Sequence, residues 1–169
     1  GSADASVMLM MLNQYFSLDI STEKLMAYAA ELGSDCPFFI LNKPCYVTGR
    51  GENLSPIDVD LSSYQIVLVN PRIHISTQTA FAGIKTRKGT DLVRHIQEPV
   101  HTWKDHCIND FEHTVFKAYP EIEQIKKDLY QSGAIYASMS GSGSTVYGIF
   151  EKTSVPRLNF PAHYFYKSV

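Results

Sequence analysis

Three stretches of the sequence combine glycine, hydroxyl and carboxylate residues in ways that suit phosphate chemistry. The first, GSADAS, begins at Gly1 and Ser2 and runs directly into an apolar helical pattern. The start of a helix presents free N–H groups and the positive end of its dipole, which together bind an anion such as phosphate. Ser2 as an ordinary N-cap, or the pair as an expression-tag remnant, is the alternative. Asp4 suits the helix dipole but repels phosphate unless it turns away or joins a divalent cation.

The second stretch, LGSDCPFF, places Asp35 between Gly33, which ends a helix, and Pro37. Proline disfavours helical backbone in the residue before it, so we expect an extended segment from Cys36 onward, with Asp35 on a loop. A carboxylate held in this way can accept a proton from a substrate hydroxyl during phosphoryl transfer. An aspartate that only caps a turn is the alternative.

The third stretch, ASMSGSGSTVYGIF, has glycines and serines between two apolar runs. Gly141 and Gly143 allow the backbone to bend closely around a ligand, and Ser142 adds a hydroxyl donor. A glycine–serine hairpin without a ligand is the competing interpretation.

Two further segments are weaker candidates. In ISTQTAF, Thr77 can donate to a ligand and Phe81 can stack on a ring, although core packing is the commoner role of a phenylalanine. In NDFEH, we expect Asn109, Asp110 and Glu112 to lie mid-helix on a solvated face.

The composition of the 169 residues limits the class of protein. A net charge of −2 and a pI near 6.3 give no basic surface, so nucleic acid is not an expected partner. No apolar run is long enough to cross a membrane and no signal-peptide pattern is present, so we expect a cytoplasmic protein. The cysteines Cys36, Cys45 and Cys107 form no C-x-x-C pair and are expected to be free thiols, and no metal is expected on the six scattered histidines.

The elements that must position these residues fall on either side of a boundary near residue 62. Before it, we expect helices over 3–16 and 22–32, the second capped by Ser21, a short strand at CYVTG and a loop at GRGENLSPID. The helix over 3–16 is apolar on most sides, which predicts that it is buried.

After the boundary, the pattern predicts a strand at YQIVLVN and then a short helix capped by Ser76 or Thr77. Two or three helices are expected over 90–132, the last beginning at Pro120 with Ile122, Ile125 and Leu129 on its apolar face. Strands at AIYAS and STVYGIF and a final edge strand at HYFYKSV complete an α+β fold with helices on one face of an antiparallel sheet.

In their order along the chain, GSADAS, LGSDCPFF, ISTQTAF and SGSGST resemble the GHMP small-molecule kinases. LGSDCPFF and NDFE are similar to the branch of this family that acts on a cytidine-diphosphate-linked methylerythritol. The resemblance covers roughly residues 1–150. It implies transfer of the γ-phosphate of ATP, with Mg²⁺, to the 2-hydroxyl of that alcohol in the non-mevalonate (MEP) route of isoprenoid biosynthesis.

The resemblance also implies site residues: Asp35 as the catalytic aspartate, Gly1 and Ser2 at the end of the ATP loop, Gly141, Ser142 and Gly143 in a motif beside that loop, and Thr77 and Phe81 in the substrate site. It implies the GHMP kinase two-domain fold. Residues 1–62 would be the remainder of the N-terminal ATP-binding α/β domain, and 63–169 a ferredoxin-like C-terminal domain.

Several family features have no match in this sequence: the N-terminal substrate lysine, the cytosine-binding aromatic and histidine, and most of the ATP loop. We therefore expect no turnover from these 169 residues alone, and exposed apolar surface on the helices over 3–16 and 22–32. Monomer and homodimer both remain open. The alternatives are another GHMP kinase, acting on homoserine or a mevalonate-type alcohol, and a non-catalytic ferredoxin-like module that binds a ligand.

Overall fold

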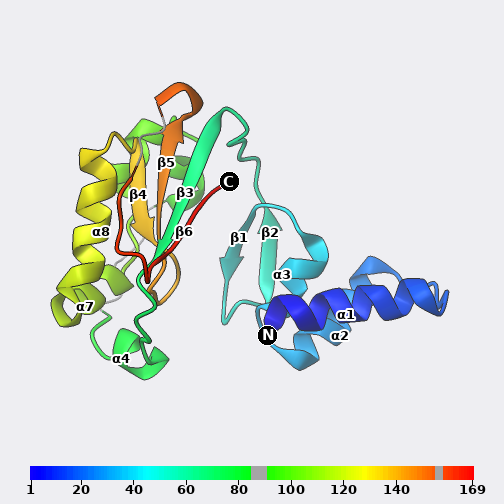
Figure 1. The fold of residues 1–169 in the computed structure, drawn as a ribbon. Helices are drawn as coiled ribbons and strands as arrows, with labels where there is room; N and C mark the ends of the chain where they lie inside the picture. The colour runs from blue at the N-terminus through cyan, green and yellow to red at the C-terminus, as the bar shows by residue number, and fades with distance from the viewer. Residues whose placement is uncertain (85–90, 155–157) are drawn as a thin grey trace. The chain divides into compact units, whose positions relative to one another are not determined.

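The computed structural model describes residues 1–84, 91–154 and 158–169. They form two compact units, Gly1–Val59 and Asp60–Val169, and each has a core of its own (Figure 1). Within the described ranges, no helix has the length and apolar character that a membrane crossing requires. All three cysteines are free, as predicted.

The first unit begins with helices α1 (Ser2–Tyr15) and α2 (Thr22–Leu32), as predicted. Ser21 caps α2 by accepting a hydrogen bond from the Lys24 N–H at 3.4 Å, and Gly33 follows its last residue. Both signals lie in the local sequence, which explains why the ends of α2 could be predicted.

The segment after Asp35 is helical, so the predicted extended exit is wrong. Helix α3 (Cys36–Leu41) has Pro37 in its first turn and ends at Asn42, whose φ of 48° is left-handed. Proline is tolerated in a first turn because its missing N–H would have no intrahelical partner there. A short apolar run such as FFIL fits a buried helix as well as a strand, and this helix packs on both α1 and α2.

A hairpin of β1 (Cys45–Thr48) and β2 (Asn53–Pro56) completes the unit, with Cys45 opposite Pro56. The strand β1 was predicted, whereas the predicted loop GRGENLSPID contains β2. Because β2 lacks apolar alternation, pairing with β1 rather than its own pattern makes it a strand.

Helix α1 is mostly exposed, so the prediction that it is buried is wrong. The buried core of this unit comes from α2 and α3 and consists of Leu25, Ala29, Cys36 and Ile40. The apolar surface predicted on the two N-terminal helices is confirmed, and its largest exposed side chains are Val7, Met8, Met11, Leu12, Tyr15, Tyr28 and Leu32.

The second unit is built on a four-stranded sheet in the order β4-β5-β3-β6, with every neighbouring pair antiparallel. The strands are β3 (Tyr64–Asn70), β4 (Tyr136–Met139), β5 (Val146–Glu151) and β6 (Phe165–Ser168). In chain order the sheet reads second, third, first, fourth, which is the ferredoxin-like arrangement. The last strand pairs only with β3 and lies at an edge, as predicted.

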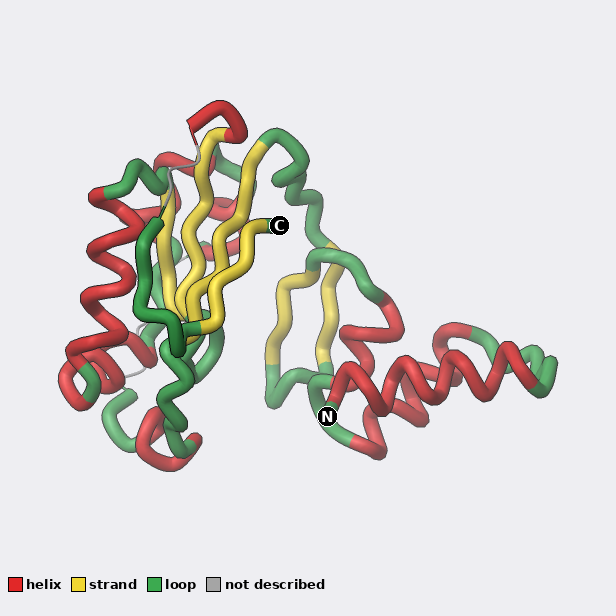
Figure 2. The backbone as a smooth tube through the Cα atoms, in the orientation of Figure 1, coloured by secondary structure: helices red, strands yellow, loops and turns green. Residues whose placement is uncertain are grey.

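Helices cover one face of this sheet (Figures 1 and 2). Their bounds are α4 (Thr77–Phe81), α5 (Leu92–Ile96), α6 (Trp103–His106), α7 (Phe111–Ala118) and α8 (Pro120–Gln131), with 3₁₀ turns η1 (Val100–Thr102) and η2 (Lys152–Ser154). Residues 91–132 thus hold more helices than predicted. The sequence did not reveal α5 and α6 because both are too short to show a helical period of apolar residues.

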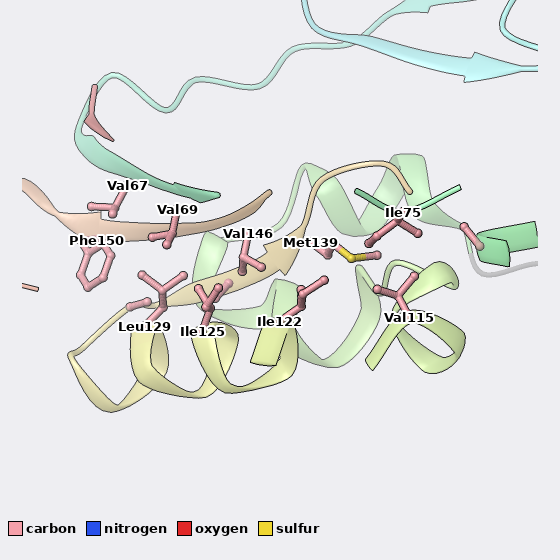
Figure 3. Close-up of a cluster of buried hydrophobic side chains, with 13 residues drawn as sticks. Val67, Val69, Ile75, Val115, Ile122, Ile125, Leu129, Met139, Val146 and Phe150 are labelled. Carbon is pink, nitrogen blue, oxygen red and sulfur yellow. The ribbon is translucent and has the colours of Figure 1, made fainter. Parts of the chain in front are cut away.

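The core of the second unit lies between α8 and the sheet (Figure 3). Ile122, Ile125 and Leu129 are buried, as the helical period predicted, and they face strand residues such as Val69 and Phe150. Burying each such side chain contributes about 1.5–3 kcal/mol to folding. This core includes Met139 and Val146, at the strand ends that the glycine-rich loop connects.

Candidate active site

The first unit contains a cavity of about 520 Å³ beside the start of α1 and the start of α3. Three of the predicted site residues, Gly1, Ser2 and Asp35, line it together. The other lining residues are Ala3, Phe38, Phe39, Val47, Gly51 and Leu54. The cavity thus combines a helix N-terminus and a carboxylate with apolar walls, as sites for small molecules commonly do.

Asp35 occupies the N-cap position of α3, but its side chain makes no capping bond. Its carboxylate is exposed and, among the described residues, accepts a single long hydrogen bond, 3.5 Å, from the Ser34 hydroxyl to Oδ1. Gly51 approaches from the β1–β2 turn with φ of 119°, and a Cβ there would lie 3.0 Å from the same oxygen. The exposed carboxylate is therefore open to a further hydrogen bond, or to a proton from a ligand.

Ser6 joins the two sides of this cavity, and the sequence analysis did not single it out. Its buried hydroxyl lies 2.9 Å from the Ser2 carbonyl oxygen and 2.8 Å from that of Cys36. The contact ties the first turn of α1, with Gly1 and Ser2, to the residue after Asp35. A serine inside a helix gives no local sign of such a long-range contact.

The glycine-rich loop of the second unit connects β4 to β5. Gly141 and Gly143 have φ of 55° and 94°, which side-chain-bearing residues rarely adopt. A Cβ at Gly143 would also lie 2.7 Å from Ile75 and 2.9 Å from Met139 at the end of the core, whereas Gly141 faces open space. The loop is closed by a hydrogen bond from the Ser140 N–H to the Thr145 carbonyl at 2.8 Å. Its glycines are thus required by the backbone path.

The NDFE segment is not a solvated face, so that prediction is wrong. Helix α7 begins at Phe111, which leaves Asn109 and Asp110 before it. Glu112 is buried because it lies on the side of α7 that meets the end of β4. Asn109 and Glu112 both bond to residues at the start of the glycine-rich loop.

The two residues predicted for the substrate site belong to α4. The backbone of Thr77 begins this helix, whose N-cap is Ser76, while the side chain of Thr77 lies outside the described residues. Phe81 is 57% exposed and meets Phe111 edge to face at a centroid distance of 4.8 Å. Part of the Phe81 ring is thus packed against Phe111, and more than half of the residue is accessible.

A histidine cluster lies away from these residues, near α5 and α6. Donor atoms of His95, Glu98 and His106 lie within 4.8 Å of one another, which is a spacing that could hold a metal ion. The two imidazoles stack at 4.0 Å with planes 10° apart, so their in-plane lone pairs run side by side rather than converge. A hydrogen bond from His95 lowers the pKa of Glu98, as the pairing at 3.2 Å predicts.

Residues 97–158, which begin just after α5 and continue beyond β5, match the family model described as GHMP kinases C terminal. This chain carries a GHMP kinase C-terminal domain. The matched range includes NDFE and the glycine-rich loop, so two of the segments that carried the resemblance lie inside it.

The relatives of this chain match almost all of it. It is 48% identical over 170 residues to a protein of Bacteroides fragilis named 4-diphosphocytidyl-2-C-methyl-D-erythritol kinase, with 99% of this chain and 62% of the relative covered. A protein of Azobacteroides pseudotrichonymphae with the same name is 49% identical over 172 residues, with 98% and 63% covered. The chain thus spans less than two thirds of the length of these relatives.

Two solved structures show that the fold is that of GHMP kinases. A crystal structure of 4-(cytidine 5'-diphospho)-2C-methyl-D-erythritol kinase matches with a TM-score of 0.75 at 24% identity, covering 88% of this chain and 55% of the other. A homoserine kinase of Cytophaga hutchinsonii matches with a TM-score of 0.60 at 13% identity, covering 85% and 53%. The likeness includes the first unit, since it extends well beyond residues 97–158.

Proposed function

We propose that this chain is part of an ATP-dependent kinase that phosphorylates the 2-hydroxyl of 4-diphosphocytidyl-2-C-methyl-D-erythritol in isoprenoid precursor biosynthesis. The observation that carries the proposal is identity of 48–49% over nearly the whole chain to proteins named for that activity. The cavity that holds Asp35 beside a helix N-terminus supplies matching chemistry. Residues 1–62 are then assigned to the ATP-binding domain and 63–169 to the C-terminal domain.

In the proposed reaction, the substrate hydroxyl oxygen attacks the γ-phosphorus of ATP, the bond to the β-phosphate oxygen breaks, and ADP leaves. The hydroxyl proton passes to the carboxylate of Asp35, which is exposed and open to a further hydrogen bond. Since phosphoryl transfer has a loose transition state, orienting the hydroxyl is as much the role of this carboxylate as removing its proton.

The phosphates require positive partial charge, which the backbone can supply. The first turn of α1 lines the cavity at Gly1 and Ser2, and the free N–H groups and positive dipole end of a helix N-terminus suit a phosphate. In the second unit, we assign the loop of Gly141, Ser142 and Gly143 to the same nucleotide. Phe81 and Thr77 are assigned to the substrate, with the exposed ring of Phe81 as a stacking surface for cytosine.

The Ser2 hydroxyl and the Asp35 carboxylate fit a magnesium ion, because both are hard oxygen donors that line one cavity. Bound with ATP, Mg²⁺ would neutralise charge on the transferring phosphate. The chain's own residues bind and orient the two substrates.

Another GHMP kinase activity is the second candidate, favoured by the structural match to a homoserine kinase. That match has 13% identity and shows only the fold, whereas the relatives at 48–49% share one name that specifies the cytidine substrate. Fold alone does not decide between substrates in a family.

The test is a comparison of alcohol acceptors with the full-length protein encoded by the gene. We expect ATP-dependent phosphorylation of the cytidine substrate with a kcat/KM at least about 10³-fold above that for homoserine or mevalonate, because a site built to bond polar groups rejects acceptors that lack them. Product formation is followed by phosphorus NMR, with ATP omitted as the control. Equal or better use of homoserine would overturn the proposal.

A further inference from the structure

Asn109, just before α7, binds two carbonyl groups where β4 passes into the glycine-rich loop. Its side-chain nitrogen donates to the carbonyl oxygens of Met139 at 2.7 Å and Gly141 at 2.8 Å. Its side-chain oxygen accepts from the N–H of Phe111 at 3.0 Å, which fixes the orientation of the amide. Together, the three hydrogen bonds of the Asn109 side chain hold the backbone at Met139 and Gly141 against the start of α7.

Glu112 holds the same segment from the next turn. Its Oε1 accepts from the Met139 N–H at 2.8 Å and from the Ser138 hydroxyl at 3.1 Å, and its Oε2 pairs with the Lys126 ammonium at 2.6 Å. The Glu112 side chain is only 8% exposed. A carboxylate so deeply buried is stable only when it is paired and hydrogen-bonded, which makes this contact costly to disturb.

These bonds determine which way the loop presents its N–H groups. The peptide unit between Gly141 and Ser142 is planar and trans, so its carbonyl and its N–H point in opposite directions. Because the Gly141 carbonyl faces Asn109, the Ser142 N–H faces away from α7. Within the described part of the chain, this N–H and that of Gly141 have no hydrogen-bond partner.

We propose that Asn109 and Glu112 are positioning residues that hold the loop over 140–144 with its N–H groups directed at a phosphate of ATP. The proposal rests on the assignment of this loop to the nucleotide under the proposed function. Neither side chain touches the nucleotide in this account; each acts through the backbone of Met139 and Gly141. The competing role is support of the fold alone, which would lower stability without changing nucleotide use.

The test is Asn109→Asp in the full-length protein, because a carboxylate would place oxygen against the two carbonyl oxygens that the amide now bonds. We expect the dissociation constant and KM for ATP to rise at least about tenfold, while the KM for the alcohol acceptor changes less than about threefold. Asn109→Ala removes the donors without adding repulsion and should give a smaller rise. Asn159→Asp, at an exposed position of the same unit, is the charge-matched control and should leave both constants unchanged.

Melting temperatures are measured on every variant. A lowered melting temperature with unchanged ATP binding in the folded variants would overturn the positioning role and leave the proposed function standing. Absence of ATP binding by the wild-type protein would overturn both. If Asn109→Asp does not fold, Asn109→Ala decides, and unchanged ATP constants in that folded variant would contradict the proposal. Glu112→Gln keeps an oxygen to accept from the Met139 N–H and should therefore retain most of the ATP binding.

Discussion

Tyr136 on β4 is a buried phenol whose hydroxyl ties the sheet to the end of α6. The residue is 5% exposed, and its hydroxyl donates to the Cys107 carbonyl at 2.6 Å. The ring packs edge to face with Trp103 at a centroid distance of 5.6 Å. Burial raises the pKa of Tyr136 well above its usual range, and the neighbouring Tyr147 hydroxyl raises it further. The folded protein therefore keeps this phenol neutral at alkaline pH.

The raised pKa predicts a loss of stability at alkaline pH. Above about pH 10 the unfolded chain releases the proton of Tyr136, whereas the folded chain retains it. The free energy of unfolding is therefore highest below that pH and falls as the pH rises toward the pKa of Tyr136 in the folded state. Tyr136→Phe should flatten this decline. At pH 8 it should lower the free energy of unfolding by about 1–2 kcal/mol, because the Cys107 carbonyl loses its donor.

Urea unfolding at several pH values between 8 and 11.5 checks this expectation. Tyr15→Phe, at an exposed phenol, is the control and should keep the wild-type slope. A Tyr136→Phe variant that loses stability with pH as steeply as the wild type would contradict the assignment.

Single candidate site residues could be located from the sequence where their surroundings are local. Asp35 could be located because a helix stop and a proline flank it within a few residues, and the structure places it in a cavity with Gly1 and Ser2. Glu112 could not be interpreted in this way, because its backbone partner Met139 lies 27 residues away. Ser6 bonds across 30 residues and has no local signature either.

At the scale of elements, the long and strongly patterned ones were predictable. Helix α8 has a proline in its first turn, three buried apolar residues at helical spacing and Gly133 just beyond its end. The strand β2 has no such pattern and exists because β1 pairs with it. Helix α3 was mistaken for a strand because six residues are too few to show a helical period.

The exposed apolar face of α1 predicts self-association of this chain. Met8 and Met11 are 54% and 57% exposed and lie three residues apart on one side of the helix. Contiguous apolar surface of this kind favours contacts between molecules. Met8→Glu combined with Met11→Lys leaves the net charge unchanged and should shift the chain toward monomer in sedimentation velocity.

The matched control for this experiment is Glu31→Lys combined with Lys43→Glu, which exchanges charges at exposed positions of the same unit. It should leave the association of the chain as it is. A wild-type chain that is a monodisperse monomer with one cooperative melting transition would contradict the prediction.

At the scale of the molecule, each unit holds some of the residues with a proposed role. Gly1, Ser2 and Asp35 belong to the first, and the glycine-rich loop and Phe81 to the second. Each unit has its own buried core, so each set of residues is held by packing within its unit. An antiparallel sheet with helices on one face was predictable from the order of strands and helices, and the resemblance to GHMP kinases implied its ferredoxin-like topology, whereas the contacts that orient its loop were not predictable.

The central claim is that Asp35 is the catalytic aspartate of a kinase, and Asp35→Asn in the full-length protein tests it most directly. The amide keeps the size of the side chain but cannot take up the substrate proton. Steady-state kinetics with ATP and the cytidine substrate should show kcat reduced by about 10²-fold or more. The KM for ATP should change less than about threefold, and Asp58→Asn, at an exposed carboxylate of the same unit, should behave as the wild type. An Asp35→Asn protein with an unchanged kcat would contradict the claim and favour a ligand-binding module without catalysis.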